Sequence, residues 1–301
     1  MGYYNRFIER FPTVHDLAQS PQNQVFKLWE GLGYYSRCRN LIATAQKVSV
    51  ELNGRFPNTP EGLLSLKGVG PYTAAAIGSF AFGLPLAVVD GNVIRVISRF
   101  LGITQPVDRP RTKKNMELMA QELLDEKNPA VYNQAIMDFG AVVCKPQQPL
   151  CDRCPLKKKC VAFNEGIQSS IPRKTPKTKA QVRYLNYLIL EHKGRQLVRK
   201  RSENDIWKDL YEFVLLEKDE PQDMQELQNL KSWGLKSSRV AKQVMDVSDE
   251  IIHQLTHRKI ICRLVHIRIE EPIQLQGYEW KTKNAILQLP FPRLITRYLN
   301  W

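Results

Sequence analysis

The sequence contains no long apolar run, and this absence excludes a large class of proteins. No stretch approaches the roughly 20 consecutive apolar residues that a membrane-spanning helix needs. The first residues, MGYYNRFIERF, carry charges throughout and contain no apolar core of a signal peptide. Arg6 stands where a myristoylation signal has Ser or Thr. The pattern therefore predicts a cytoplasmic protein.

Acidic residues are scarce relative to basic ones. The chain has 30 Asp and Glu against 44 Lys and Arg, which gives a formal net charge of +14. Such an excess attracts polyanions, of which nucleic acid is the commonest. A basic protein with a solvated surface is the alternative. With 301 residues and 43% hydrophobic content, the chain is long enough for two domains with filled cores.

The first part of the chain lacks strand patterns. Apolar residues recur at helical spacing, with caps expected at Thr13 and Thr59, and predict an all-α domain over residues 1–166. Residues 167–180 are rich in Pro, Ser, Thr and Lys and predict a linker. Apolar runs around a glycine turn, with a short helix between later runs, then predict an α+β domain over residues 181–301.

Four of the six cysteines lie in one loop with the spacing C-x6-C-x2-C-x5-C, namely Cys144, Cys151, Cys154 and Cys160. In a reducing compartment, clustered cysteines more often bind metal than form disulfides. Four thiolates can hold a tetrahedral zinc ion or a cubane iron–sulfur cluster, and the spacing leaves this choice open. Two disulfides or four unreactive thiols are the alternatives. Cys38 and Cys262 are expected to be packed single thiols.

A glycine turn precedes a run of small residues in LKGVGPYTAAA. Gly68 and Gly70, with Val69 between them, allow main-chain N–H groups to point at an approaching phosphate. Pro71 suits the first position of a helix, where its missing N–H costs little. Short G-x-G runs occur by chance, so a plain tight turn is the alternative.

Asp90 follows an apolar run and precedes Gly91 at a predicted loop-to-helix junction. A helix N-cap is the simplest interpretation. A lone carboxylate beside a phosphate-binding turn also suits the stabilisation of a developing sugar cation. Arg95 and Arg99 lie one turn apart on the following helix, as either a solvated face or a backbone-contacting stripe.

These three elements, in this order, resemble the DNA glycosylase superfamily. The turn resembles its helix-hairpin-helix, Asp90 lies twenty residues after Gly70 as the catalytic aspartate does there, and the cysteine loop is similar to its 4Fe–4S cluster loop. Endonuclease-type members carry a lysine where this chain has Tyr72, which cannot form a Schiff base. The motifs GVGPYTA, GLGYYSR, VVDGNV and YNQAIMDFGAVVC look like the adenine DNA glycosylase family.

The resemblance implies base-excision repair by a monomer on duplex DNA at the bacterial nucleoid. The implied reaction is hydrolysis of the N-glycosidic bond of adenine mispaired with 8-oxoguanine or guanine. The implied catalytic residues are Asp90, Tyr72 and Asn92. The implied DNA contacts are Gly68, Val69 and Gly70 at the phosphates, with Tyr34 as an intercalating wedge. The four clustered cysteines are implied to hold a 4Fe–4S cluster that is structural and senses DNA.

The second domain resembles the Nudix-like domain with which this family recognises oxidised guanine. The run WKDLYEF, from Trp207 to Phe213, resembles the start of one of its strands. The run HQLTHRKI resembles its F-S-H loop, with Thr256 and His257 as implied DNA contacts. No G-x5-E-x7-R-E-x2-E-E box occurs, so nucleotide pyrophosphatase activity is not expected. Without the resemblance, His257 is a surface histidine.

Members of the family carry about fifty residues ahead of the segment that YYNRFIERFPT matches. These residues include a glutamate that protonates adenine. Glu9 and Glu61 of this chain lie in other motifs and are not expected to take that role. The resemblance therefore predicts an adenine DNA glycosylase chain that lacks this N-terminal segment and has no glutamate in the matching place. A catalytically impaired lesion-binding protein, an endonuclease-type pyrimidine glycosylase and a zinc-dependent transcription factor stay open as alternatives.

The metal can be identified from the purified protein. If the four clustered cysteines hold an iron–sulfur cluster, the protein will be brown, with iron and acid-labile sulfide in equal amounts. Visible absorption and metal analysis measure this. Colourless protein with bound zinc would contradict the cluster and favour the transcription factor.

Overall fold

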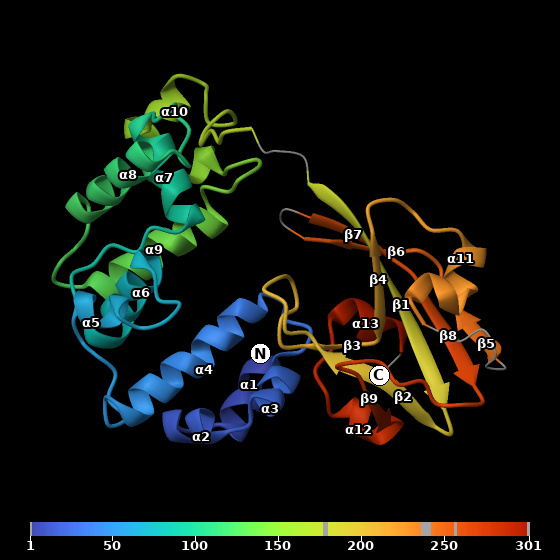
Figure 1. The fold of residues 1–301 in the computed structure, drawn as a ribbon. Coiled ribbons are helices and arrows are strands. Elements are labelled where there is room, and N and C mark those ends of the chain that lie inside the picture. The colour runs from blue at the N-terminus through green and yellow to red at the C-terminus, as the bar shows by residue number, and fades with distance from the viewer. Residues whose placement is uncertain (1, 177–179, 236–241, 256–257, 300–301) are drawn as a thin grey trace. The chain divides into compact units, whose positions relative to one another are not determined.

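The computed structural model describes residues 2–176, 180–235, 242–255 and 258–299 (Figure 1). It forms two compact units, one built from residues 1–46 together with 178–301 and the other from residues 47–177. All regular elements before residue 181 are helical among the described residues, and strands occur only after it. The predicted fold class, an all-α first part followed by an α+β part, is therefore confirmed. Nowhere in the described ranges does a helix have the length and apolar character to cross a bilayer.

The chain begins with four helices, which are α1 (Gly2–Arg10), α2 (Val14–Gln19), α3 (Gln22–Trp29) and α4 (Tyr35–Val50). The first unit holds all of them except residues 47–50 at the end of α4. A capping box confirms the predicted cap at Thr13. The Thr13 hydroxyl oxygen accepts from the Asp16 N–H at 3.2 Å, and the Asp16 carboxylate accepts from the Thr13 N–H at 3.0 Å. These reciprocal bonds fix the start of α2.

The rest of the first unit is a mixed sheet with short helices. Its strands are β1 (Gln181–His192), β2 (Arg195–Lys200), β3 (Tyr211–Glu212), β4 (Val214–Lys218), β5 (Lys242–Val247), β6 (Ile251–Gln254), β7 (Arg258–Cys262), β8 (Leu264–Ile269) and β9 (Glu279–Thr282). Its helices are α11 (Met224–Gln228), η3 (Leu230–Trp233), α12 (Lys283–Leu287) and α13 (Arg293–Tyr298). The long strand β1 pairs in parallel with β7 and β8 and antiparallel with β2 and β4.

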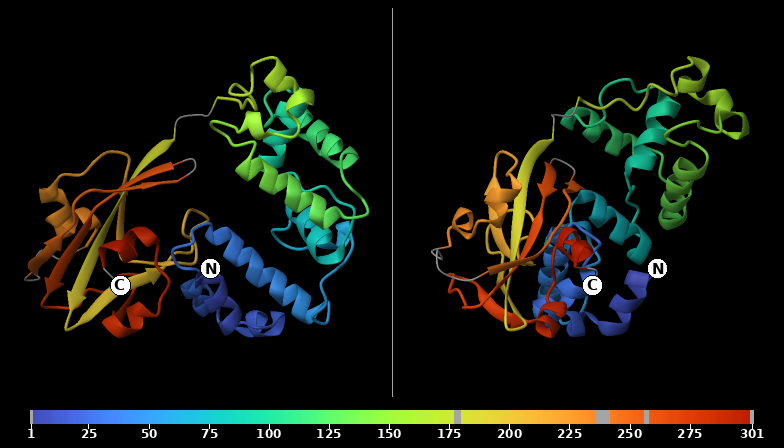
Figure 2. Two further views of the ribbon diagram at one scale, coloured as in Figure 1. Left: turned by 180° about the vertical axis from the view of Figure 1, so that it is seen from behind. Right: turned by 90° about the vertical axis from the view of Figure 1, so that its right-hand side faces the viewer.

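Both faces of this sheet are covered. Leu188 and Leu190 of β1 pack with Trp233 on the face covered by α11 and η3. Tyr187 of β1 packs with Ile295 on the face covered by α12 and α13. The two sets of helices lie on opposite sides of the sheet, as Figures 1 and 2 show from three directions. Apolar residues of α2, α3 and α4 join the second of these cores, so the N-terminal helices and the sheet share one hydrophobic cluster.

The second unit contains α5 (Pro60–Leu64), α6 (Pro71–Phe82), α7 (Gly91–Leu101), α8 (Pro110–Glu122), α9 (Pro129–Val142), η1 (Cys151–Arg153), η2 (Lys157–Lys159) and α10 (Val161–Asn164). The predicted cap at Thr59 is confirmed, since its hydroxyl oxygen accepts from the Gly62 N–H at 3.1 Å. Val93 and Ile97 of α7 pack against Met116 of α8 in the core. The unit thus has a small apolar centre beneath the start of α7.

The chain that leaves the second unit is held against it. Ile171 is buried, and the Arg173 carbonyl oxygen accepts from the Val107 N–H at 3.0 Å. The Thr175 N–H donates to the Asp108 carboxylate at 3.0 Å. We call residues 171–175 the strap. Its proline and lysine content predicted a linker. The contacts that hold it against the second unit involve residues far away in the sequence, which composition does not indicate.

A network of charged side chains joins three strands of the first unit. Arg183 of β1 donates two hydrogen bonds to the Asp205 carboxylate, at 2.7 and 3.0 Å, and a third to Glu217 at 2.6 Å. Arg258 of β7 also donates to Asp205. Partial burial opposes ionisation of Asp205, but the hydrogen bonds from Arg183, the Ile206 main chain and Arg258 outweigh it and hold the pKa well below its usual value.

This lowered pKa makes part of the stability dependent on pH. A carboxyl group whose pKa is lower in the folded state stabilises the fold above its unfolded value, about 4, and this contribution is lost as the pH falls toward the folded value. We expect Asp205→Asn to lower the free energy of unfolding by about 1–3 kcal/mol at pH 7, with a difference that shrinks below pH about 4. Urea unfolding at several pH values measures it. Asp219→Asn, an exposed carboxylate after β4, is the control; an equal pH dependence in both variants would contradict the assignment.

Candidate active site

The turn before α6 leaves main-chain N–H groups available to a ligand. Gly68 has a φ of 81°, in the left-handed region that favours glycine. Gly70 is the N-cap of α6 and makes no side-chain cap hydrogen bond, and Pro71 occupies the first turn as the sequence predicted. The first N–H groups of a helix without a cap are suited to bind an anion. Tyr72 follows on the same turn with half of its surface exposed.

Asp90 is the N-cap of α7, and both oxygens of its carboxylate accept hydrogen bonds. One oxygen, Oδ1, accepts from the Asn92 and Val93 N–H groups, each at 2.8 Å. The other, Oδ2, accepts from the Asn92 side-chain amide at 2.9 Å. Among the residues that the structure describes, no cation forms an ion pair with Asp90. Because a carboxylate oxygen has two lone pairs, Oδ2 retains one for a further partner.

Asn92 is positioned by a close approach of α9 to α7. A Cβ atom at Gly140 would lie 2.7 Å from the Asn92 Cβ and 3.0 Å from its carbonyl oxygen. The Asn92 side chain bridges two groups, since its amide nitrogen donates to Asp90 and its oxygen accepts from Arg95 at 2.8 Å. Because residue 140 has no side chain, α9 can approach α7 closely at Asn92, the hydrogen-bond partner of Asp90.

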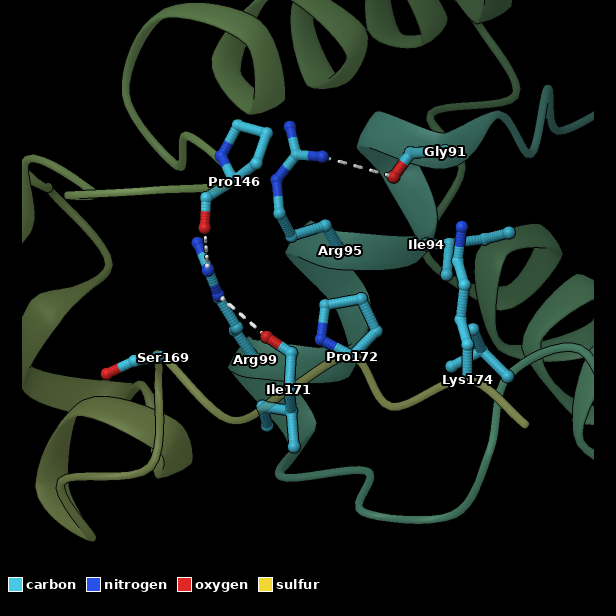
Figure 3. Close-up of a pocket in the computed structure, with 10 residues that line it drawn as sticks. Gly91, Ile94, Arg95, Arg99, Pro146, Ser169, Ile171, Pro172 and Lys174 are labelled. Carbon is cyan, nitrogen blue, oxygen red and sulfur yellow. Dashed lines mark hydrogen bonds between the residues drawn. The ribbon is translucent and has the colours of Figure 1, made fainter. Parts of the chain in front are cut away.

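Arg95 and Arg99 are buried and make contacts that their spacing alone did not indicate. Arg95 donates to the carbonyl oxygens of Cys144 at 2.7 Å and Gly140 at 2.6 Å. Arg99 donates to the carbonyl oxygens of Lys145 at 2.6 Å and Pro146 at 3.0 Å. Figure 3 shows both side chains beside a cavity of about 290 Å³, which the strap also lines. The two arginines form neither the solvated face nor the stripe of DNA-backbone contacts that their spacing suggested. They instead join α7 to the cysteine loop of the same chain.

Arg99 also ties the strap to α7. Its Nε donates to the Ile171 carbonyl oxygen at 3.2 Å, as Figure 3 shows. In Arg95, one helical turn before Arg99, burial lowers the pKa of the guanidinium. Such burial of arginine is tolerated where the N–H groups find acceptors, and carbonyl oxygens supply them here. α7 thus organises the loop, the strap and the start of its own helix.

The four cysteines of the loop lie close to one another. Burial first, and then the neighbouring thiols of Cys144, Cys154 and Cys160, raise the pKa of Cys151. Arg99 donates to the Cys144 Sγ at 3.4 Å, and the Cys160 thiol lies 3.4 Å from the Arg99 carbonyl oxygen. All four are free thiols, as are the buried Cys38 and Cys262, whose predicted packing is confirmed.

This donor set fits a sulfur-ligated group. Within the described ranges, no three His, Cys, Asp or Glu side chains are arranged around a single metal ion. Four thiols gathered in one loop are the ligands that an iron–sulfur cluster requires, and a cubane is wider than one ion, so its ligands stand further apart. The buried Arg95 and Arg99 beside the loop would offset part of the negative charge of four thiolates.

Asn133 of α9 connects the two halves of the site. This fully buried side chain donates to the Ser79 hydroxyl of α6 and to the Leu86 carbonyl oxygen, each at 2.8 Å, and accepts from the Val88 N–H at 2.9 Å. α6 follows the glycine turn, and Val88 precedes Asp90. One asparagine therefore fixes the chain leading to the carboxylate against the helix that begins at the turn. The sequence analysis did not identify it; an amide within an apolar helical run was the available signal.

The other predicted DNA contacts belong to the first unit or lie outside the described residues. Tyr34 lies directly before α4, is 64% exposed and has a φ of 48°. The Arg37 guanidinium lies over its ring, 4.6 Å from the centroid. An aromatic ring held outward in this way suits contact with bases. Thr256 and His257 fall outside the residues that the structure describes.

Comparisons with known proteins agree with this arrangement. The model of the HhH-GPD superfamily base excision DNA repair protein matches residues 1–124, and the NUDIX domain model matches residues 186–301. The adenine DNA glycosylase of Buchnera aphidicola subsp. Baizongia pistaciae (strain Bp) is 32% identical over 271 residues, which cover 89% of this chain and 74% of the relative. The chain belongs to the adenine DNA glycosylase family. Members of this base-excision repair family are enzymes that hydrolyse N-glycosidic bonds in DNA.

Two further comparisons each cover a little over half of this chain. The human adenine DNA glycosylase is 45% identical over 172 residues, which cover 57% of this chain and 32% of the human protein. This chain thus spans about a third of the length of that relative. A solved structure of a thermostable thymine-DNA glycosylase is 30% identical, with a TM-score of 0.51, and the match covers 55% of this chain and 76% of that chain. The family predicted from the glycine turn, Asp90 and the cysteine loop is confirmed.

The close approach at Gly140 generates a prediction. Gly140→Ala would bring a methyl group against the main chain of Asn92, which cannot move without displacing Asp90. We expect a loss of about 1–3 kcal/mol in the free energy of unfolding. Chemical denaturation measures it. Gly91→Ala, where the added Cβ meets nothing within 4 Å, is the control and should change stability by no more than about 0.5 kcal/mol. Equal stability of the two variants would contradict the packing argument.

Proposed function

We propose that the protein removes adenine mispaired with 8-oxoguanine, or with guanine, from duplex DNA. The observation that carries the proposal is the Asp90 carboxylate, which three hydrogen bonds hold at the N-terminus of α7 and which forms no ion pair with a cation of the described residues. Hydrolysis of an N-glycosidic bond leaves positive charge on the sugar as the base departs. A fixed carboxylate is the group that stabilises such charge.

Asp90 acts on the sugar, and Asn92 positions it. As adenine leaves, the Asp90 oxygen with the free lone pair either stabilises the oxocarbenium ion or traps it covalently before water completes hydrolysis. The Asn92 amide and two main-chain N–H groups hold that carboxylate, so it need not reorganise during the reaction. Tyr72 supports the site as a polar residue. Because it carries no amine, the enzyme is monofunctional and leaves the strand uncut.

The duplex is bound through its phosphates and opened at one base. The main-chain N–H groups around Gly68, Val69 and Gly70 contact a phosphate, because the start of α6 has no side-chain cap. Tyr34 enters the stack as a wedge, which its exposure and its fixed outward position support. Flipping adenine costs a few kcal/mol, and mispairing lowers this cost.

The Nudix-like part of the first unit reads the oxidised guanine through Thr256 and His257. Support comes from the hairpin strands β6 and β7, which flank those residues. The four cysteines of the loop hold a 4Fe–4S cluster, which would supply a rigid, charged fold element rather than chemistry at the sugar. Lys158 and Lys159, exposed on the same loop, present positive charge to the DNA. The protein acts as a monomer at the bacterial nucleoid.

The proposed role of Asp90 is tested by separating excision from binding. We expect Asp90→Asn to reduce single-turnover excision of adenine opposite 8-oxoguanine by at least about 100-fold. Binding of the same duplex should persist, since removing a negative charge does not weaken attraction to phosphate. Asp138→Asn, an exposed carboxylate on α9, is the control and should leave both unchanged.

Two outcomes would overturn parts of this function. Retained excision by the Asp90→Asn variant would remove Asp90 from the mechanism. Tight and selective binding by the wild-type chain without any product would instead identify a lesion-binding protein. Product formation opposite 8-oxoguanine that exceeds product formation opposite guanine supports the proposed specificity.

A further inference from the structure

The loop between β2 and β3 is a closed structure with unusual backbone angles. We call residues 202–209 the bridging loop. Its ends are joined by two main-chain hydrogen bonds, from the Arg201 N–H to the Leu210 carbonyl oxygen at 2.8 Å and from the Asp209 N–H to the Arg201 carbonyl oxygen at 2.9 Å. Trp207 and Asp209 have φ values of 60° and 71°, which non-glycine residues seldom adopt. Such residues persist where surrounding contacts hold them.

One side of the bridging loop holds the β6–β7 hairpin by both strands. The Trp207 ring lies 6.0 Å from the His253 ring of β6. The Asp205 carboxylate accepts from Arg258, the first residue of β7, and is fixed to the centre of the sheet by two hydrogen bonds from Arg183. Arg258 directly follows His257, to which we assigned lesion recognition. The bridging loop is therefore fastened to the strand residue that directly follows the two residues assigned to lesion recognition.

The other side of the bridging loop is held by α4. The Arg39 guanidinium donates to the Lys208 carbonyl oxygen at 2.9 Å and lies 3.7 Å from the Asp209 carboxylate. Arg39 is one helical turn beyond Tyr35, the buried first residue of α4, and Tyr34 immediately precedes it. All of these residues belong to the same compact unit. The contact thus reaches the helix that directly follows the wedge tyrosine.

We propose that the bridging loop couples the lesion-recognition hairpin to α4, the helix that directly follows the wedge Tyr34, with Arg39 and Asp205 as positioning residues for specificity. The inference rests on the proposed function, because it requires that Tyr34 enters the duplex and that the hairpin reads the opposite base. Both must engage one base pair at the same time. A fixed spacing between them removes the cost of ordering each one separately on the DNA, and this gain is realised only when the hairpin finds its lesion.

The test is the ratio of dissociation constants of the full chain for adenine opposite guanine and adenine opposite 8-oxoguanine. Asp205→Asn and Arg39→Gln should each lower this ratio about three- to tenfold, mainly by weakening binding to the 8-oxoguanine duplex. Asp205→Glu, which keeps the charge, should recover part of the ratio. Glu191→Gln is the matched control, because it removes a carboxylate paired with His266 and Arg268 on the same sheet but away from the bridging loop; its ratio should equal that of the wild type.

A second readout separates coupling from a local structural effect. In amide hydrogen exchange, Arg39→Gln should speed exchange in residues 251–262 of the hairpin. Among the described residues of that hairpin, none forms a hydrogen bond or ion pair with Arg39, whose partners are Lys208 and Asp209. Melting curves confirm that each variant is folded, and if Asp205→Asn unfolds, Arg39→Gln on a separate helix carries the test. The double variant should lower the ratio of dissociation constants no further than the more strongly affected single variant does, because both substitutions act through one loop.

The outcomes distinguish the two proposals. A wild-type ratio near one would defeat the proposed function. A clear wild-type preference that both variants keep within twofold, or faster exchange confined to residues 205–211, would defeat the coupling while the proposed function stood.

Discussion

Two buried guanidinium groups on one face of α7 hold the second unit together. Arg95 and Arg99 direct their N–H groups at carbonyl oxygens of the cysteine loop, and Arg99 adds the strap. Because each buried N–H would be costly if unpaired, the loop and the strap can take only conformations that present those oxygens. Arg95 also orients Asn92, which holds Asp90. The position of the Asp90 carboxylate therefore depends on Arg95, whose guanidinium binds both Asn92 and the Cys144 carbonyl oxygen of the cysteine loop.

Local rules sufficed for much of the fold. The caps at Thr13 and Thr59, the proline at the start of α6 and the glycine turn between β1 and β2 each depend on a few neighbouring residues, and each was predicted. The cap geometry at Asp90 was also predictable, since Asp before a helix usually accepts from its first N–H groups. What the pattern alone left open was whether the carboxylate has a second role; the family resemblance supplied that role.

Long-range contacts were beyond sequence reasoning. Arg95 and Arg99 were visible as two arginines one turn apart, but only the folded loop shows which acceptors they meet. Asn133 lies in the motif YNQAIMDFGAVVC, but the motif did not indicate its role, because its three partners come from α6 and from the chain before Asp90. The packing of α2, α3 and α4 on one face of the sheet joins segments more than 100 residues apart in the chain, and neither segment carries a pattern that names the other.

Residue 140 has a consequence for how variants of this enzyme are interpreted. A search for functional groups around Asp90 finds the asparagine and the arginine but passes over glycine, which contributes no chemistry. Yet the hydrogen atom in place of a methyl group there sets the spacing between two helices, and with it the position of the Asp90 carboxylate. An inactive protein with a change at that position would keep every reactive side chain intact, and its defect would be one of geometry that no chemical rescue could restore.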